Sequence, residues 1–232
     1  MNQNRSSAVM QQRREAKDSL DDFPTQPWAT RAVCEWLQRE VGYLELYDVR
    51  EPAANRGYMA RVLLEYFGAV EASDVFDYGV GYAVDDYLFP GRNQKTHWTI
   101  TNPPFRLAPQ FIEKARATSQ MGVGMFVRSA FLEGQERYET LFAIDPPHVI
   151  LQFAERVVLH RNKVVDPNVA VEKLNKKTGA IEKKKPSSAT AYSWLLWLGP
   201  ERRNRRPEFG WISPCRARLE RPGDYDAPQV LK

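Results

Sequence analysis

The chain has 232 residues, enough for one domain with a substantial core, and its 43% hydrophobic and 12% aromatic content is typical of a globular protein rather than a disordered one. It has no run of 18 apolar residues, and its N-terminus lacks a secretory hydrophobic segment. With three histidines and two distant cysteines, a zinc site is not expected. We therefore expect a cytoplasmic, metal-free protein in which Cys34, within a helical pattern, is a buried free thiol.

The net charge of +4 is distributed unevenly along the chain. Residues 1–150 contain 16 Lys and Arg against 20 Asp and Glu, whereas residues 151–232 contain 17 against 9. A slightly acidic body joined to a basic C-terminal third predicts a polyanion-binding face at one end. The alternative is that the lysine-rich stretch is only a solvated loop.

The predicted elements alternate between helices and strands. After a polar segment over 1–20, an apolar stripe from Trp28 to Val41 predicts a helix, a strand follows over 44–49, and a second helix ends at Gly68. Further strands are predicted over 70–74, 98–101, 123–127, 149–153 and 191–198, with helices through 111–115 and 135–142. This order indicates an α/β fold with a mostly parallel, doubly wound sheet and helices on both faces. Ligands bind such sheets at the carboxyl ends of the strands.

Two basic stretches do not fit this alternation. Residues 161–188 are expected to form a mobile loop or small hairpin at the sheet edge, and they contain Lys163, Lys173, Lys176, Lys177, Lys183, Lys184 and Lys185. Arg202, Arg203, Arg205 and Arg206 follow the last predicted strand. We therefore expect a flexible segment over 1–20, a main domain over 21–200 that includes the insert 161–188, and a basic tail over 201–232.

Asn102-Pro103-Pro104-Phe105 directly follows the predicted strand 98–101 and is the most informative motif. Two prolines fix the backbone and donate no hydrogen bond, so the Asn102 side chain and the neighbouring carbonyls face one point. An exocyclic amine needs such acceptors for its N–H groups. The alternative is a loop that the prolines merely stiffen.

Acidic residues follow the two preceding strands. Glu51 to Gly57 is a turn of mostly small residues that lets a ligand approach the backbone, and Glu51 suits an ammonium group. Asp74, roughly twenty residues further on, is where an acid can bind ribose hydroxyls. Asp86 and Tyr87 offer an acid and an aromatic ring that suit an adenine. Taken alone, the turn is equally typical of an ordinary loop, and each acid is more often a solvated loop residue.

Together these motifs resemble the amino-group class of S-adenosylmethionine-dependent DNA methyltransferases, particularly the small adenine-N6 enzymes of phages and prophages. The resemblance covers roughly residues 22–200 and implies a Rossmann-like class I methyltransferase fold. The order of its motifs is that of the gamma class. Residues 128–134 also resemble the phage enzymes, as do residues 192–197, which we expect to pack in the core.

The resemblance assigns roles to individual residues. It implies that cofactor is bound by Thr25, Trp28, Glu51, Pro52, Ala53, Asn55, Gly57, Asp74, Asp86 and Tyr87, and that Asn102, Pro103, Pro104 and Phe105 are catalytic. Asn55 departs from the family pattern, in which glycine is usual, although asparagine tolerates left-handed backbone conformations. The lysines of the insert and the four arginines after it are expected to contact phosphates.

The implied reaction is methyl transfer from S-adenosylmethionine to N6 of an adenine flipped out of DNA. Asn102 and the Pro103 carbonyl would accept the amine hydrogens, and Phe105 would stack on the base. We expect a monomer or weak dimer in a bacterial or phage-infected cell, with DNA as partner and neither membrane nor metal. Open alternatives are RNA adenine or guanine or a protein glutamine as acceptor, and a non-catalytic nucleic-acid-binding protein with a degenerate fold. A Rossmann oxidoreductase is disfavoured, because the chain lacks the glycine fingerprint of that class.

Overall fold

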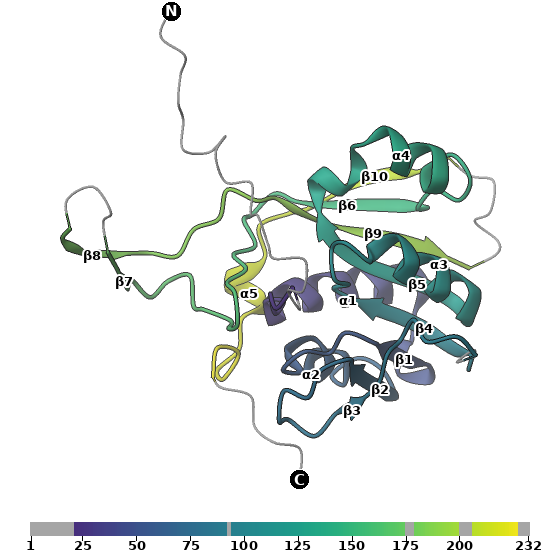
Figure 1. Cartoon of the computed structure of the whole chain (residues 1–232), viewed down its shortest axis with the longest axis horizontal. Coiled ribbons are helices and arrows are strands. Elements are labelled where there is room, and N and C mark those ends of the chain that lie inside the picture. Colours follow the sequence, from purple (N-terminus) through teal and green to yellow (C-terminus); the bar gives the residue numbers. More distant parts are fainter. Residues whose placement is uncertain (1–20, 92–93, 175–178, 200–205, 227–232) are drawn as a thin grey trace, which may run out of the picture.

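The computed structural model describes residues 21–91, 94–174, 179–199 and 206–226 (Figure 1). The first half comprises α1 (Pro27–Val41), η1 (Leu44–Leu46), β1 (Asp48–Glu51), α2 (Tyr58–Leu63), β2 (Ala69–Asp74), β3 (Ala83–Val84), β4 (Thr96–Thr101) and α3 (Ala108–Thr118). The second half comprises β5 (Ser119–Arg128), η2 (Ser129–Leu132), α4 (Gln135–Arg137), η3 (Tyr138–Phe142), β6 (Val149–Phe153), β7 (Val171–Leu174), β8 (Ile181–Lys184), β9 (Tyr192–Leu198), β10 (Glu208–Ile212) and α5 (Arg216–Leu219).

Among the described residues, eight strands form one sheet in the order β10-β6-β9-β5-β4-β1-β2-β3. Strand β9 runs antiparallel to β5 and β6, and the other neighbours pair in parallel. The predicted mostly parallel α/β fold is confirmed. None of the helices in the described parts of the chain is long and apolar enough to span a bilayer.

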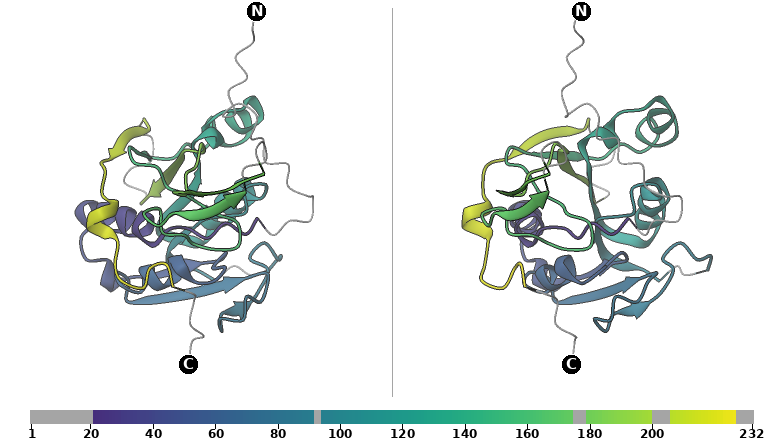
Figure 2. Two further views of the ribbon diagram at one scale, coloured as in Figure 1. Left: turned by 90° about the vertical axis from the view of Figure 1, so that its left-hand side faces the viewer. Right: turned by 60° about the vertical axis from the view of Figure 1, so that its left-hand side comes forward.

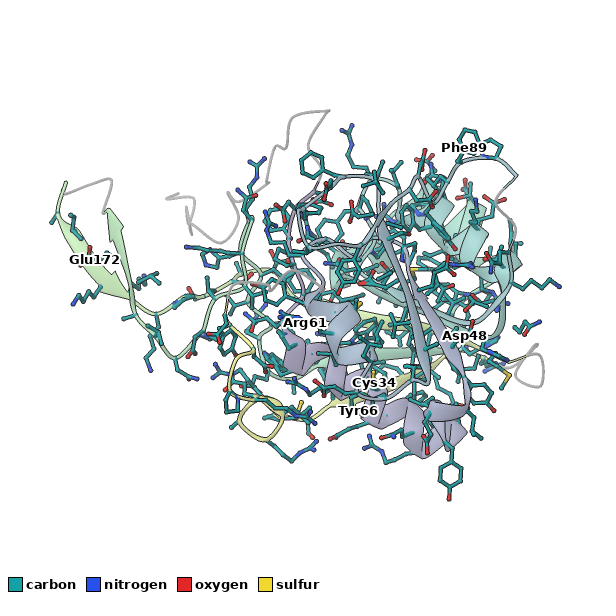
Figure 3. The ribbon with its side chains drawn as sticks, turned by 90° about the horizontal axis from the view of Figure 1, so that it is seen from below. Cys34, Asp48, Arg61, Tyr66, Phe89 and Glu172 are labelled. Carbon is teal, nitrogen blue, oxygen red and sulfur yellow. The ribbon has the colours of Figure 1, made fainter. Side chains whose placement is uncertain are left out.

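Helices cover both faces of the sheet (Figure 2). On one face the indole of Trp28 in α1 packs in a core with Trp98, Trp194 and Phe126 of the sheet. On the other face, α3 packs on β5 and β9 in a second core. Cys34 lies on the inner side of α1 as a buried free thiol, as predicted (Figure 3).

The expected strand over 44–49 is wrong in its first part. Residues 44–46 form a 3-10 turn, and β1 begins at Asp48 and runs to Glu51. Leu44 is buried whereas Leu46 is 72% exposed, and a strand of period two would place both side chains on one face. The shift carries Glu51 onto the last residue of β1.

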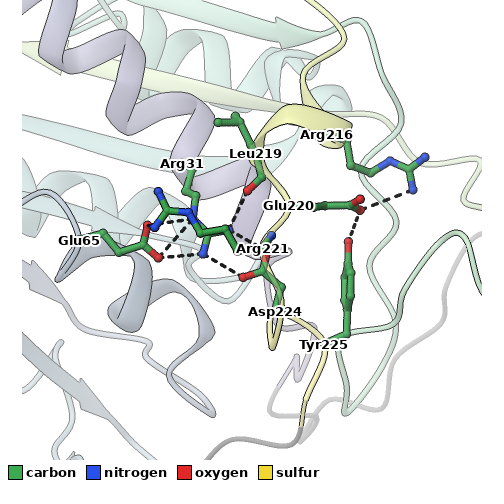
Figure 4. Close-up of polar contacts among 8 residues, drawn as sticks. All are labelled: Arg31, Glu65, Arg216, Leu219, Glu220, Arg221, Asp224 and Tyr225. Carbon is green, nitrogen blue, oxygen red and sulfur yellow. Dashed lines mark hydrogen bonds and ion pairs between the residues drawn. The ribbon is translucent and has the colours of Figure 1, made fainter.

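The expected tail over 201–232 contains a strand and a helix that sequence reasoning did not anticipate. Strand β10 pairs in parallel with β6 and becomes the edge of the sheet, and α5 packs against α1. Arg31 of α1 donates to the Leu219 carbonyl and to both carboxylate oxygens of Asp224, and it also binds Glu65 (Figure 4). These contacts hold the C-terminal segment against α1 and the rest of the domain.

The insert 161–188 contains a two-stranded antiparallel hairpin, β7–β8. It projects away from the body, as Glu172 on β7 shows (Figure 3). The chain leaves the sheet at the carboxyl end of β6 and returns at the start of β9. Because β9 runs antiparallel to β6, both points lie at the end of the sheet where the parallel strands have their carboxyl ends. The hairpin therefore leaves the sheet at the end where α/β sheets bind ligands.

Candidate active site

A cavity of about 250 Å³ lies at the carboxyl ends of β1, β2 and β4. Of the predicted site residues, it is lined by Thr25, Glu51, Pro52, Ala53, Asn55, Asp74, Asp86, Tyr87, Asn102 and Pro104. Parallel strands that end at one edge bring these segments together although they are far apart in the chain. In the sheet order, β1 and β4 are adjacent, which is the crevice where doubly wound sheets bind ligands.

Four of the residues predicted to bind cofactor or to be catalytic do not line this cavity. Trp28 is fully buried, and its ring packs edge-on against Phe153 at 5.5 Å, so it belongs to the core. Gly57 lies behind the loop, where an added Cβ would meet the Tyr82 ring at 2.4 Å. Pro103 is buried, and Phe105 is half-buried against the core and outside the lining. Trp28 is therefore a core residue, and Gly57 packs against the Tyr82 ring.

Asn55 adopts the left-handed backbone region, with φ of 52°. Its N–H donates to Asp74 Oδ2 at 2.8 Å, and its side-chain amide donates to Asp22 at 2.7 Å. The Arg56 N–H in turn donates to Asn55 Oδ1, and Arg56 forms an ion pair with Asp22 at 2.6 Å. The loop thus has the backbone for which glycine is usual, and the asparagine side chain adds hydrogen bonds that hold it.

Glu51 is the most strongly perturbed acid in the cavity and is only 1% exposed. Burial raises its pKa to about 8, and the charge of Asp74 acts in the same direction. The hydroxyl of Thr101 at 2.5 Å and the N–H of Ala53 at 3.4 Å donate to Oε1 and partly offset this effect. A buried carboxyl poised near neutrality is suited to pair with a bound cation.

Asp74 ends β2 and accepts two backbone hydrogen bonds, from Asn55 and from Phe76 at 3.0 Å. Burial nevertheless raises its pKa above the ordinary value, with the charge of Asp22 contributing. Both carboxylate oxygens are thus fixed in direction, as binding of vicinal hydroxyls requires.

The catalytic-type tetrapeptide is held by the segment that precedes α1. Asn102 Nδ2 donates to the Phe23 carbonyl at 2.9 Å, and the Phe105 N–H donates to Asp21 Oδ2 at 2.7 Å. Because the amide nitrogen is held by Phe23, the amide oxygen of Asn102 is directed away from this contact. The side chain is positioned as a hydrogen-bond acceptor beside the cavity.

The Phe105 ring has one face occupied. The Arg128 guanidinium, at the end of β5, lies 4.0 Å from its centroid, and the Tyr192 ring lies 6.5 Å away. A base that stacks on Phe105 must therefore use the remaining face or displace Arg128. Arg128 was not singled out as a site residue by sequence reasoning, and neither was Asp21. Arg128 begins the segment 128–134 that resembles the phage enzymes, and Asp21 directly precedes the stretch over which the resemblance runs.

The basic residues lie apart from this cavity. Lys163, Lys183, Lys184, Lys185 and Arg206 are exposed. Lys173 lies on β7, whereas Lys176, Lys177, Arg202, Arg203 and Arg205 lie outside the described residues. In the hairpin register, Glu172 faces Lys183 and Glu182 faces Lys173, so its charge is mixed rather than purely basic.

Comparisons with known proteins define the fold. Neither a protein-family model nor a curated protein sequence matches the chain. Among solved structures, a protein of Listeria monocytogenes assigned as a class I S-adenosylmethionine-dependent methyltransferase is similar, with a TM-score of 0.54 and 13% identity over 84% of this chain and 67% of that one. A protein of Pyrococcus horikoshii assigned as an RNA methyltransferase has a TM-score of 0.50 and 15% identity over 86% of this chain and 99% of that one. The chain has the Rossmann-like fold of class I methyltransferases.

Proposed function

We propose that the protein transfers a methyl group from S-adenosylmethionine to the exocyclic N6 amine of adenine in DNA. The observation that carries the proposal is the position of Asn102. It follows the central strand β4, lines one cavity with Glu51 and Asp74, and has its amide orientation set by the Phe23 carbonyl. This arrangement supports a role for Asn102 as a hydrogen-bond acceptor for an amine, beside a site that suits a cationic nucleoside.

The donors of the cavity fit S-adenosylmethionine. Glu51 suits the α-ammonium, Asp74 suits the ribose hydroxyls, and Asp86 with Tyr87 suits the adenine. Thr25 Oγ1 is buried in the lining and has no hydrogen-bond partner among the described residues, so it is available for the cofactor's carboxylate. The sulfonium of this cofactor supplies an electrophilic methyl group.

The chain's own part in the reaction is to hold the acceptor amine. The Asn102 oxygen and the Pro103 carbonyl accept its two hydrogens, which turns the nitrogen lone pair toward the methyl group. The free face of Phe105 stacks on the base, and Arg128 supports the ring from behind. No strong base is needed before attack, because the amine proton becomes acidic only as the N–C bond forms and the methyl–sulfur bond breaks, and it then leaves to water. Positioning and electrostatics therefore supply most of the acceleration.

DNA as the acceptor is supported by the position of the insert. The hairpin leaves the sheet at the edge that carries the cavity, and Lys184 and Lys185 are exposed on it. Phosphate contacts there would hold a duplex while one base is flipped. The left-handed φ of Asn55 supports a working cofactor loop over a degenerate one.

The test combines acceptor identification with one variant. Wild-type protein is incubated with labelled S-adenosylmethionine and, separately, with unmodified DNA, RNA and protein, followed by nucleoside and amino-acid analysis. We expect N6-methyladenine in DNA. Asn102→Ala should lower turnover by at least about 100-fold, because one oriented acceptor is removed, while calorimetry shows nearly unchanged cofactor binding.

Three results would contradict parts of the proposal. Absence of cofactor binding by the wild type would exclude the enzyme. Label found only in RNA or protein would exclude DNA as acceptor. Near-normal turnover of Asn102→Ala would exclude the amine-orienting role.

A further inference from the structure

A second groove, of about 400 Å³, lies at the carboxyl ends of β6 and β10. Its lining includes Gln152, Arg156, Tyr192, Phe209 and Trp211. The groove is separate from the cofactor-type cavity and shares no lining residue with it. Nothing in the proposed reaction so far uses it.

Phe209 and Trp211 form an exposed aromatic pair on the edge strand. They are two residues apart on β10, and by register they share a face with Ile150 and Gln152 of β6. The side chains are 58% and 66% exposed, and the rings meet edge to face at 5.3 Å. Two large exposed rings on one short strand contribute little to the core and mark a binding surface.

The floor of the groove packs close to the catalytic-type tetrapeptide. Tyr192, which begins β9, lines the groove, stacks on Phe126 with centroids 5.1 Å apart, and lies 6.5 Å from Phe105. Tyr192 is only 1% exposed, so its ring forms the floor of the groove rather than a contact surface. Contact with bases in the groove therefore falls to the two exposed rings on β10.

The charges along the groove favour a polyanion. Arg156 in the lining is exposed, with its Nη1 held by the Ala189 carbonyl at 3.1 Å, and Arg206 is exposed just before β10. Glu155, the acidic residue of the lining, is neutralised by Arg216 at 3.0 Å. The same positive charge disfavours pairing of two copies of the chain through this edge.

We propose that this groove binds an unpaired, single-stranded segment of the nucleic-acid substrate. Trp211 and Phe209 serve as stacking platforms for unstacked bases, and Arg156 and Arg206 contact the backbone phosphates. Aromatic platforms within a basic groove are the usual way in which proteins bind single strands. The inference rests on the proposed function, because it identifies the acceptor as a nucleic acid with bases displaced near the reacting adenine.

The test measures binding of a labelled single-stranded oligodeoxynucleotide of about 12 nucleotides, and of the matching duplex, across a salt series. Trp211→Ala should weaken single-strand binding about 5- to 100-fold without changing the slope of log affinity against log salt, because stacking releases no counterions. Arg156→Ala should instead reduce that slope by about 0.7. Trp211→Phe should restore most of the affinity.

Controls separate folding, self-association and loss of the proposed function. Tyr43→Ala removes an aromatic side chain that is 73% exposed and precedes the amino end of β1, so it should bind as the wild type does. Thermal unfolding and sedimentation check the fold and the oligomeric state of every variant. If Trp211→Ala binds like the wild type, or dissociates a wild-type dimer, the groove assignment is overturned while methyl transfer stands. If wild-type protein binds cofactor but no nucleic acid, both the groove assignment and the proposal of DNA as the acceptor are overturned.

Discussion

Glu51 connects cofactor binding to proton binding. Its pKa of about 8 in the folded protein is well above the ordinary 4.5, because burial favours the neutral acid. A bound ammonium favours the carboxylate, so cofactor binding near pH 7 should release a proton. Calorimetry in buffers of different ionisation enthalpy should detect this release in the wild type and not in Glu51→Gln. Equal proton release in both proteins would show that a group other than Glu51 loses the proton.

The same shift predicts how stability depends on pH. Between pH 4.5 and 8 the folded protein holds a proton on Glu51 that the unfolded chain releases, so this residue's contribution to stability falls as pH rises. Glu51→Gln removes this loss. The unfolding free energy of the variant relative to wild type should therefore increase with pH, by up to about 1.4 kcal/mol per pH unit. Urea unfolding at pH 5, 6, 7 and 8 measures the trend, and a flat difference would contradict it.

Asn55 tests whether the cofactor loop needs its backbone or its side chain. Asn55→Gly keeps the left-handed conformation without strain but removes the side-chain contacts to Asp22 and Arg56. Asn55→Ala removes the same contacts and adds strain of about 1–2 kcal/mol. We expect cofactor affinity to fall about 5- to 30-fold further in Asn55→Ala than in Asn55→Gly, as measured by calorimetry. Equal affinities of the two variants would show that the backbone conformation is not what the site needs.

At the scale of elements, the hairpin β7–β8 is not uniformly basic. Lys183 faces Glu172 across the ladder, and opposite charges in such pairs attract. Charge reversal of Lys184 and Lys185 should therefore weaken DNA binding and reduce the salt slope by about 0.9 for each phosphate that is no longer neutralised. Glu172→Gln should strengthen binding, because it removes a negative charge opposite Lys183 and leaves the hairpin more basic. An unchanged slope in the reversal variant would exclude the hairpin as the DNA-binding element.

The elements that the sequence predicted well are those with strong periodicity. The apolar runs of α1 and β6 have the expected boundaries. In α1 the buried residues give a helical pattern, and in β6 buried and half-buried residues alternate along one short strand. Strand β10 was missed because its apolar residues Phe209, Trp211 and Ile212 are few and are interrupted by Gly210. Prolines at 207 and 214 bound this run, and a short run with glycine and flanking prolines gives a weak strand signal.

At the scale of the whole molecule, the cavity could be predicted because its residues end adjacent parallel strands. Glu51, Asp74 and Asn102 each end or follow a recognisable strand, and topology alone brings them to one edge. The contacts of Asp21 with Phe105 and of Arg128 with the same ring could not be predicted, because they depend on how a segment without regular structure folds over the sheet. The contacts that hold the C-terminal segment could not be predicted either, because Arg31 and Asp224 are 193 positions apart.

The contacts of Arg31 with the C-terminal segment should determine much of the stability of the chain. Arg31 is buried and binds Glu65 and Asp224. Glu65 keeps Arg221 as a second partner, but Arg31→Ala leaves the buried carboxylate of Asp224 without a cation and should cost about 3–5 kcal/mol. Thermal unfolding should shift by roughly 6–20 °C for a chain of this size. Arg218 and Glu35 form a matched ion pair at 2.7 Å in which the arginine is exposed, and Arg218→Ala should change stability by no more than about 1 kcal/mol. If both variants unfold at the same temperature, the C-terminal segment is held by its apolar contacts, such as Leu219 in the core, rather than by Arg31.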